Sequence, residues 1–144
     1  MDKFVLVYGG TKKQRWLIED ITWWFCEKYF KRFKSFNIEI DLCKIPEKVQ
    51  GWCMEIDKNC SHIQIDKRLG LGDDFITCVL HELVHVKQQF KGELKEYPAN
   101  SGIEKMWKGE IYLGIDYMNL PWEKEAYAMQ ETLLIEYKKR GIYA

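Results

Sequence analysis

The sequence predicts an α+β fold in a single domain that spans residues 1–144. Two observations predict this class. Segments with strand and helix patterns follow one another in the order strand, helix, three strands, helix, weakly patterned stretch, helix. No repeat, low-complexity segment or interdomain linker divides them. A chain of 144 residues is also long enough to bury a sizeable apolar core without disulfides.

The N-terminal segment combines one strand with one helix. Residues 3–8 form a short apolar run that ends at Gly9 and Gly10, which is typical of a buried strand. From Thr11 to about residue 33 the pattern becomes helical, and Thr11 is a suitable N-cap. The apolar positions at helical spacing are Leu17, Ile21, Trp24 and Phe25.

Three stretches in the middle of the chain are predicted as strands. Residues 37–43, 51–57 and 62–66 are strand-like, with apolar and polar positions alternating most clearly in the first and third. Lys58 and Asn59 supply turn chemistry between the last two. We therefore expect those two stretches to form a hairpin.

The second half of the chain contains two predicted helices. The first covers about residues 74–90 and could be capped by Asp73 or Asp74. Residues 93–119 carry a weak pattern interrupted by glycines, so we expect a loop with room for one hairpin. The last helix covers about residues 121–140 and begins with a proline.

Composition excludes several classes of protein. The 22 basic and 22 acidic residues cancel, so no strongly basic field attracts nucleic acid. The five cysteines form no CxxC pair, which argues against a cysteine-ligated zinc ribbon. No apolar stretch approaches membrane-spanning length, and the N-terminus does not resemble a signal peptide. We expect free thiols in a reducing, cytoplasmic setting.

One motif carries chemistry. In the stretch HELVH, His81 and His85 lie four residues apart, so a helix presents both imidazoles on one face. This geometry suits two ligands of a tetrahedral metal ion. Glu82 projects about 100° around the helix from His81, where it could reach a water on the metal rather than the metal itself. The motif therefore predicts a metal centre in which Glu82 is the general base.

A catalytic zinc ion needs three protein ligands and one open position, so the motif requires a third ligand. His62 is the remaining histidine, but it is more easily explained as an ordinary strand residue. Glu123 and Glu125, in the first turns of the last helix, are the other candidates, and both could simply offset the helix dipole. Cys78, three residues before His81, could line the site or contact the metal, although a buried free cysteine is the more common case.

The two motifs together resemble those of the gluzincin zinc metallopeptidases, in which HExxH is followed by a glutamate on a later helix. The stretch WEKEAYA is similar to the WLNEGFA-type segment of gluzincin aminopeptidases, and the ligand of that segment matches Glu125. The chain also resembles the minigluzincins and small metallopeptidase-like proteins of phages, and the ImmA/IrrE peptidases share the scheme. SprT-like proteases are similar in the first motif, but they use a third histidine, and no histidine follows His85.

The resemblance implies a zincin-like architecture, in which a small mixed sheet packs on the N-terminal helix above the HExxH helix, with the glutamate helix below. It implies Zn²⁺ bound by His81, His85 and Glu125, and a peptide substrate bound along an edge strand, for which we expect residues 62–66 (His62 to Asp66). The activity implied is peptide hydrolysis by a metal-activated water.

An additional hydrogen-bond donor is expected to stabilise the oxyanion of this reaction. In the gluzincins that the chain resembles, a tyrosine usually supplies this donor. Tyr117 is the favoured candidate because it shortly precedes the glutamate helix. The other downstream candidates are Tyr97, Tyr112 and Tyr127. Two alternatives remain: a protease with one narrow target, of the ImmA/IrrE-like or SprT-like kind, and a non-catalytic zinc-binding or protein-interaction module.

Overall fold

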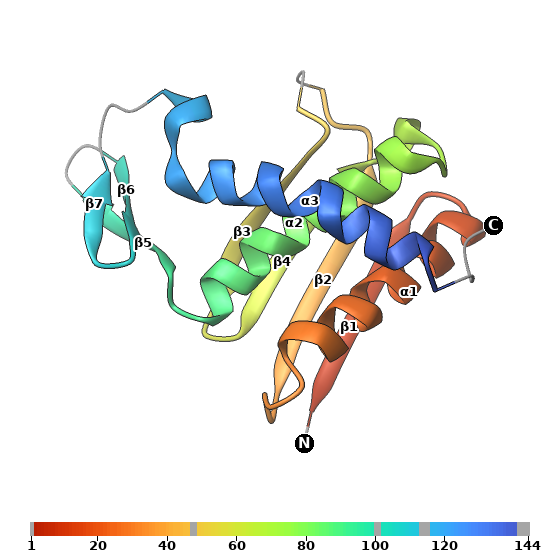
Figure 1. Cartoon of the computed structure of the whole chain (residues 1–144), viewed down its shortest axis with the longest axis horizontal. Coiled ribbons are helices and arrows are strands. Elements are labelled where there is room, and N and C mark those ends of the chain that lie inside the picture. The colour runs from red at the N-terminus through yellow and green to blue at the C-terminus, as the bar shows by residue number, and fades with distance from the viewer. Residues whose placement is uncertain (1, 47–48, 100–101, 113–115, 141–144) are drawn as a thin grey trace.

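The computed structural model describes residues 2–46, 49–99, 102–112 and 116–140. In these residues it shows a mixed α+β fold with three α-helices and two sheets (Figure 1). The helices are α1 (Lys12–Tyr29), α2 (Asp73–Phe90) and α3 (Pro121–Lys138). The strands are β1 (Lys3–Gly9), β2 (Phe36–Cys43), β3 (Gly51–Asp57), β4 (Cys60–Asp66), β5 (Leu94–Ala99), β6 (Gly102–Trp107) and β7 (Glu110–Tyr112).

The larger sheet has the strand order β1-β2-β4-β3. β1, β2 and β4 are parallel, and β3 is antiparallel to β4. The expected hairpin of β3 and β4 is confirmed, and Asn59 in its turn adopts a left-handed conformation with φ of 55°. This sheet is therefore mixed, as expected.

The expectation that His62–Asp66 forms the edge strand is wrong. β4 pairs with β2 on one side and with β3 on the other, so β4 lies inside the sheet, and β3 is the edge strand next to it. The physical reason is burial: Ile63 and Ile65 of β4 are fully buried, whereas β3 has a mostly half-buried or exposed pattern. The more deeply buried strand of the hairpin therefore lies inside the sheet, and the more exposed strand lies at its edge.

The core lies between one face of this sheet and helices α1 and α2. Alternate residues of β2 and β4 point into it, and α1 and α2 bury their apolar faces against them. α3 packs on α2 and crosses it in Figure 1, and Ala126, Leu133 and Tyr137 join the same core. Both carboxylate candidates of the last helix are thus brought beside the HExxH helix.

The helix ends agree in part with the sequence analysis. Thr11 caps α1 through a capping box with Gln14, as expected for the N-cap. For α2 the expected cap is wrong: Gly72 is the N-cap, and Asp73 and Asp74 lie in the first turn, where they suit the helix dipole. None of the described helices is long and apolar enough to cross a lipid bilayer.

The stretch expected to be mostly loop contains a second sheet instead. β5, β6 and β7 form a three-stranded antiparallel sheet, although residues 100–101 and 113–115 lie outside the described part of the chain. Leu94 and Trp107 pack with Trp122 of α3 in a small separate cluster. The second sheet therefore packs against the rest of the protein through a tryptophan that α3 supplies.

Candidate metal centre

Helix α2 places two imidazoles side by side. His81 and His85 are both buried, and their ring centroids lie 5.0 Å apart. The four-residue spacing puts them one turn apart on the face of α2 that α3 covers. The prediction that one helix presents His81 and His85 on the same face is therefore confirmed.

Helix α3 brings the carboxylate of Glu123 to both rings. His81 Nε2 lies 3.0 Å from Glu123 Oε1, and His85 Nε2 lies 3.2 Å from each of the two carboxylate oxygens. Hydrogen bonds from the two histidines and Tyr117 outweigh burial, which alone would raise the value, and hold the pKa of Glu123 well below its ordinary range. His81, His85 and Glu123 form a buried group that could hold a metal ion.

The spacing of these atoms fits a small tetrahedral site. Bonds of about 2.0–2.1 Å from zinc to nitrogen or oxygen place the ligand atoms of a tetrahedron about 3.3 Å from one another. The measured distances from the ring nitrogens to the carboxylate are 3.0 and 3.2 Å. Small outward movements of these side chains would accommodate the ion.

The outer nitrogen of each ring is held by a glutamine. His81 Nδ1 lies 2.8 Å from Gln130 Oε1, and His85 Nδ1 lies 2.8 Å from Gln88 Oε1. Each imidazole thus has an acceptor at both nitrogens. A neutral imidazole carries one proton, so the inner nitrogen needs either a second proton or a cation between it and the carboxylate. The donor set therefore suits a cation.

The protonated form of His85 satisfies this requirement when no cation is bound. Burial alone would disfavour that form, but the hydrogen bond and the charge of Glu123, together with Glu82 and Gln88, outweigh burial and raise the pKa of His85. Two histidine donors facing one buried carboxylate are the arrangement in which a divalent cation can replace protons.

Glu125, the glutamate that the sequence resemblance selects as the third ligand, does not join this group. Its Oε1 accepts a hydrogen bond from Gln88 Nε2 at 3.1 Å and lies 3.8 Å from Lys87 Nζ. Residues two apart on a helix diverge by about 200°, so only one of Glu123 and Glu125 can face the histidines. The structure brings Glu123 to them, and this corrects the expectation for Glu125.

Glu82 lies next to the histidines and is also buried. Burial raises the pKa of its carboxyl above the ordinary value, although the two imidazoles act in the opposite direction. Glu82 and His81 line two cavities, one of about 410 Å³ and one of about 220 Å³. A buried carboxyl with a raised pKa at the wall of a cavity is suited to proton transfer.

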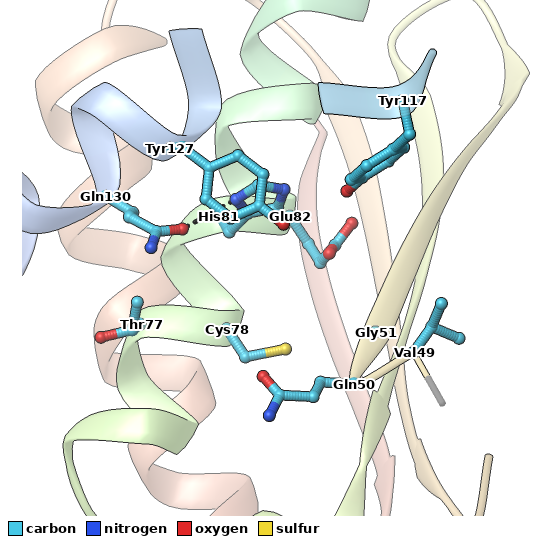
Figure 2. A pocket seen from close by; sticks show the side chains of 10 residues that line it. All are labelled: Val49, Gln50, Gly51, Thr77, Cys78, His81, Glu82, Tyr117, Tyr127 and Gln130. Atoms are coloured by element: carbon cyan, nitrogen blue, oxygen red, sulfur yellow. Dashed lines mark hydrogen bonds between the residues drawn. The ribbon is translucent and has the colours of Figure 1, made fainter. Parts of the chain in front are cut away.

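The larger cavity lies between α2, α3 and the start of β3 (Figure 2). Val49, Gln50 and Gly51 line it from the strand side, and Gln130 lines it from α3. A Cβ on Gly51 would lie only 2.9 Å from the carbonyl oxygen of Gln64 and 3.0 Å from Cys78 Sγ. Glycine at this position therefore allows the edge strand to approach α2 closely.

Two tyrosines complete the cavity wall. The Tyr117 hydroxyl donates to Glu123 Oε1 at 2.9 Å and also interacts with Tyr127. The Tyr127 ring packs 4.6 Å from the ring of His81. Tyr112 instead packs edge-on against Trp122, and the side chain of Tyr97 lies outside the described residues. The structure thus brings Tyr117, the favoured candidate, and Tyr127 to the site.

The other ligand candidates lie outside the group. His62 forms a hydrogen-bonded pair with Asp41, with Nε2 2.8 Å from Oδ2, on the central strands of the sheet. Cys78 lines the larger cavity, but burial raises the pKa of its thiol, so the thiolate that a metal prefers is disfavoured. Cys78 is a wall residue here.

The sequence analysis missed Gln88 and Gln130. A signal was available for both, because Gln88 follows His81 by seven residues and Gln130 follows Glu123 by seven residues. Seven residues are about two helical turns, so each glutamine shares a face with a residue of the group.

No known protein-family model matches the chain, and no curated protein or solved structure matches it. Within the described residues, the chain itself offers a buried group of two histidines and one glutamate that could hold a metal ion, and a neighbouring carboxyl at a cavity.

Proposed function

We propose that the protein is a zinc-dependent peptidase of the gluzincin kind with a zincin-like fold. His81, His85 and Glu123 would hold the zinc ion, and Glu82 would be the general base. One observation carries the proposal: Glu123 meets both imidazoles within 3.2 Å, while the buried Glu82 lies beside them at a cavity. The resemblance of HELVH followed by a glutamate helix to the gluzincin motifs supports the same reading.

The donor set favours zinc in a catalytic role. Two imidazoles and one carboxylate suit zinc better than magnesium or calcium, which prefer oxygen ligands alone. Three protein ligands leave one position open, whereas a structural zinc site uses four. Cys78 lines the larger cavity but does not belong to the group of ligand atoms that lie within 4.8 Å of one another, so it is not a fourth ligand.

In the proposed reaction Glu82 handles the protons. A zinc ion held by His81, His85 and Glu123 would act as a Lewis acid and make a water molecule nucleophilic at neutral pH. The Glu82 carboxylate takes a proton from the attacking water and delivers it to the leaving amine. Its position at the wall of both cavities is the observation that favours this role.

Tyr117 is the proposed donor to the oxyanion. Its hydroxyl lines both cavities and donates to Glu123, an acceptor at the reacting end of the site. A turn of the side chain would direct the same O–H group to a developing negative charge. Tyr127 is placed to orient it, because the two side chains interact.

The proposed substrate is an extended peptide that pairs with the edge strand β3. This strand is antiparallel to its neighbour, and its first residue, Gly51, lines both cavities. The five cysteines are free, which fits the cytoplasmic setting that we propose.

The first experiment measures zinc content by elemental analysis, in the wild type and in Glu123→Ala, Glu125→Ala and His62→Ala. We expect one zinc ion per chain, lost only in Glu123→Ala. Hydrolysis of an unfolded protein substrate is then compared between the wild type and Glu82→Gln. Zinc-dependent cleavage that disappears in Glu82→Gln supports the peptidase.

Two outcomes would contradict the proposal. A wild type that takes up no zinc would exclude the metal centre. A wild type that holds zinc but cleaves neither folded nor unfolded substrates would favour a non-catalytic zinc-binding module.

A further inference from the structure

We infer that Glu125, acting through Gln88, is a positioning residue for His85 and tunes the metal affinity of the centre. This inference rests on the metal site proposed above. Glu125, which the sequence resemblance selects as a ligand, would thus support the same site indirectly, by holding the glutamine that contacts His85.

Gln88 is fixed by three hydrogen bonds and is fully buried. Its Nε2 donates to the carbonyl oxygen of Trp122 at 3.0 Å and to Glu125 Oε1 at 3.1 Å. These two acceptors settle the orientation of the amide, so the oxygen Oε1 faces His85 Nδ1 at 2.8 Å. The ring of His85 is therefore held with Nδ1–H toward Gln88 and Nε2 toward Glu123.

Glu125 is itself held in place. Lys87 Nζ lies 3.8 Å from Glu125 Oε1 and 3.3 Å from Glu93 Oε1. The side chain of Glu125 is 26% exposed, so it lies at the border of the site. An acceptor on Nε2 of Gln88 polarises the amide and makes its oxygen a better acceptor for His85.

The two histidines are held differently, and this makes the inference testable. His81 receives its outer contact directly from Gln130 of α3. His85 receives its contact from Gln88 of α2, and Gln88 is in turn tied to α3 through Trp122 and Glu125. Helix α3 therefore supplies the ligand Glu123 and also fixes the orientation of both rings. A substitution of Glu125 should therefore loosen the orientation of the His85 ring.

The expected size of the effect follows from outer contacts in metal sites. Loss of a residue that orients a metal-bound histidine typically weakens metal affinity roughly 10- to 100-fold. We expect this range for Gln88→Leu, which leaves Nδ1 of His85 without its acceptor. Glu125→Ala leaves the amide in place with one anchor at Trp122, so we expect a weakening of about threefold to tenfold.

The experiment measures the zinc dissociation constant of the full-length protein by competition with a chromogenic chelator. Gln89→Leu is the matched control for Gln88→Leu, because Gln89 is a buried neighbour on α2 that bonds Ser61 rather than a histidine. Glu131→Ala, an exposed glutamate on α3, is the control for Glu125→Ala. Glu125→Gln retains an acceptor oxygen and should recover most of the affinity.

The visible spectrum of the cobalt-substituted protein is a second readout, since it depends on the geometry of the ligands. We expect it to change in Gln88→Leu and Glu125→Ala and not in the two controls. Equal zinc affinities in the wild type, Gln88→Leu and Glu125→Ala would overturn the inference while leaving the metal centre intact. If Gln88→Leu does not fold, the comparison of Glu125→Ala with Glu125→Gln and Glu131→Ala decides alone. A wild type that binds no zinc would remove both this inference and the proposed function.

Discussion

Added zinc should stabilise the folded protein by an amount that the structure allows us to work out. The group joins α2 and α3, and its members lie 38 and 42 residues apart along the chain, so the unfolded chain does not contain it. A ligand that binds only the folded state adds about 2.7 kcal/mol at a free concentration of 100 times its dissociation constant. An unfolding entropy of about 2.1 cal/mol/K per residue gives about 0.3 kcal/mol/K for 144 residues. The melting temperature should therefore rise by about 9 °C.

Thermal unfolding of the metal-free protein is followed by circular dichroism, with and without zinc buffered at that ratio. His85→Ala should abolish the rise, and His62→Ala should keep it, because His62 is paired with Asp41 far from the group in the sheet. The reasoning is refuted if zinc leaves the melting temperature unchanged. It is also refuted if His85→Ala shows the same rise as the wild type.

Three further results are expected. Glu82→Gln should keep the zinc-induced rise in melting temperature, but its rate of peptide hydrolysis should fall by at least about 100-fold. An unchanged rate would exclude Glu82 as the base. Tyr117→Phe should lower kcat by about 100-fold with little change in KM, whereas a change in KM alone would assign Tyr117 to substrate binding. Asp66→Asn should lower the free energy of unfolding near pH 7 by about 1 kcal/mol, because Asp66 accepts three hydrogen bonds from Arg68.

The pH dependence of that last effect has a definite sign. The hydrogen bonds from Arg68 lower the pKa of Asp66 to about 2 from an ordinary value of 3.8. A carboxyl whose pKa is lowered by folding stabilises the protein at pH values above its ordinary pKa. That stabilisation is lost as the pH falls towards the pKa of the folded state. The difference between the wild type and Asp66→Asn should therefore shrink between about pH 4 and pH 2 in denaturant titrations. A difference that stays constant over this range would contradict the assignment.

The parts of the site that could be predicted from the sequence are those that depend on one helix. The spacing of His81, Glu82 and His85 determines which of them share a face, and no other element is needed for that inference. The N-cap at Thr11 and the hairpin turn at Asn59 were predictable for the same reason, since their geometry is local.

Which glutamate meets the two histidines could not be predicted in this way, because it depends on how α3 is rotated against α2. The apolar positions of α3 include Ala126, Leu133 and Tyr137, and Glu123 and Glu125 lie on opposite flanks of that stripe. Glu123 shares its flank with Gln130, seven residues later, and this polar pairing was the available signal. The similarity of WEKEAYA to a gluzincin segment instead favoured Glu125, which lies on the other flank.

The prediction that residues 62–66 form an edge strand was wrong for a comparable reason: the position of a strand in a sheet depends on how separate elements pack. The stretch 62–66 shortly precedes α2 in the sequence, but proximity in the chain does not decide which strand lies at the edge. The two fully buried isoleucines of β4, Ile63 and Ile65, require cover on both sides, and β3 supplies it on one of them.

The two ends of α3 bury different kinds of residue. Its N-terminal end buries Glu123 beside Glu82 and the two imidazoles, and this is unfavourable unless each charge is compensated. Leu133 and Tyr137, at the other end of the helix, are almost completely buried in the main core, and the Tyr137 hydroxyl bonds Asp20 of α1. Apolar burial at the C-terminal end thus holds α3 against α2, while its N-terminal end presents Glu123. A zinc ion would compensate the buried carboxylate more fully than hydrogen bonds do, and this is the physical origin of the stabilisation expected above.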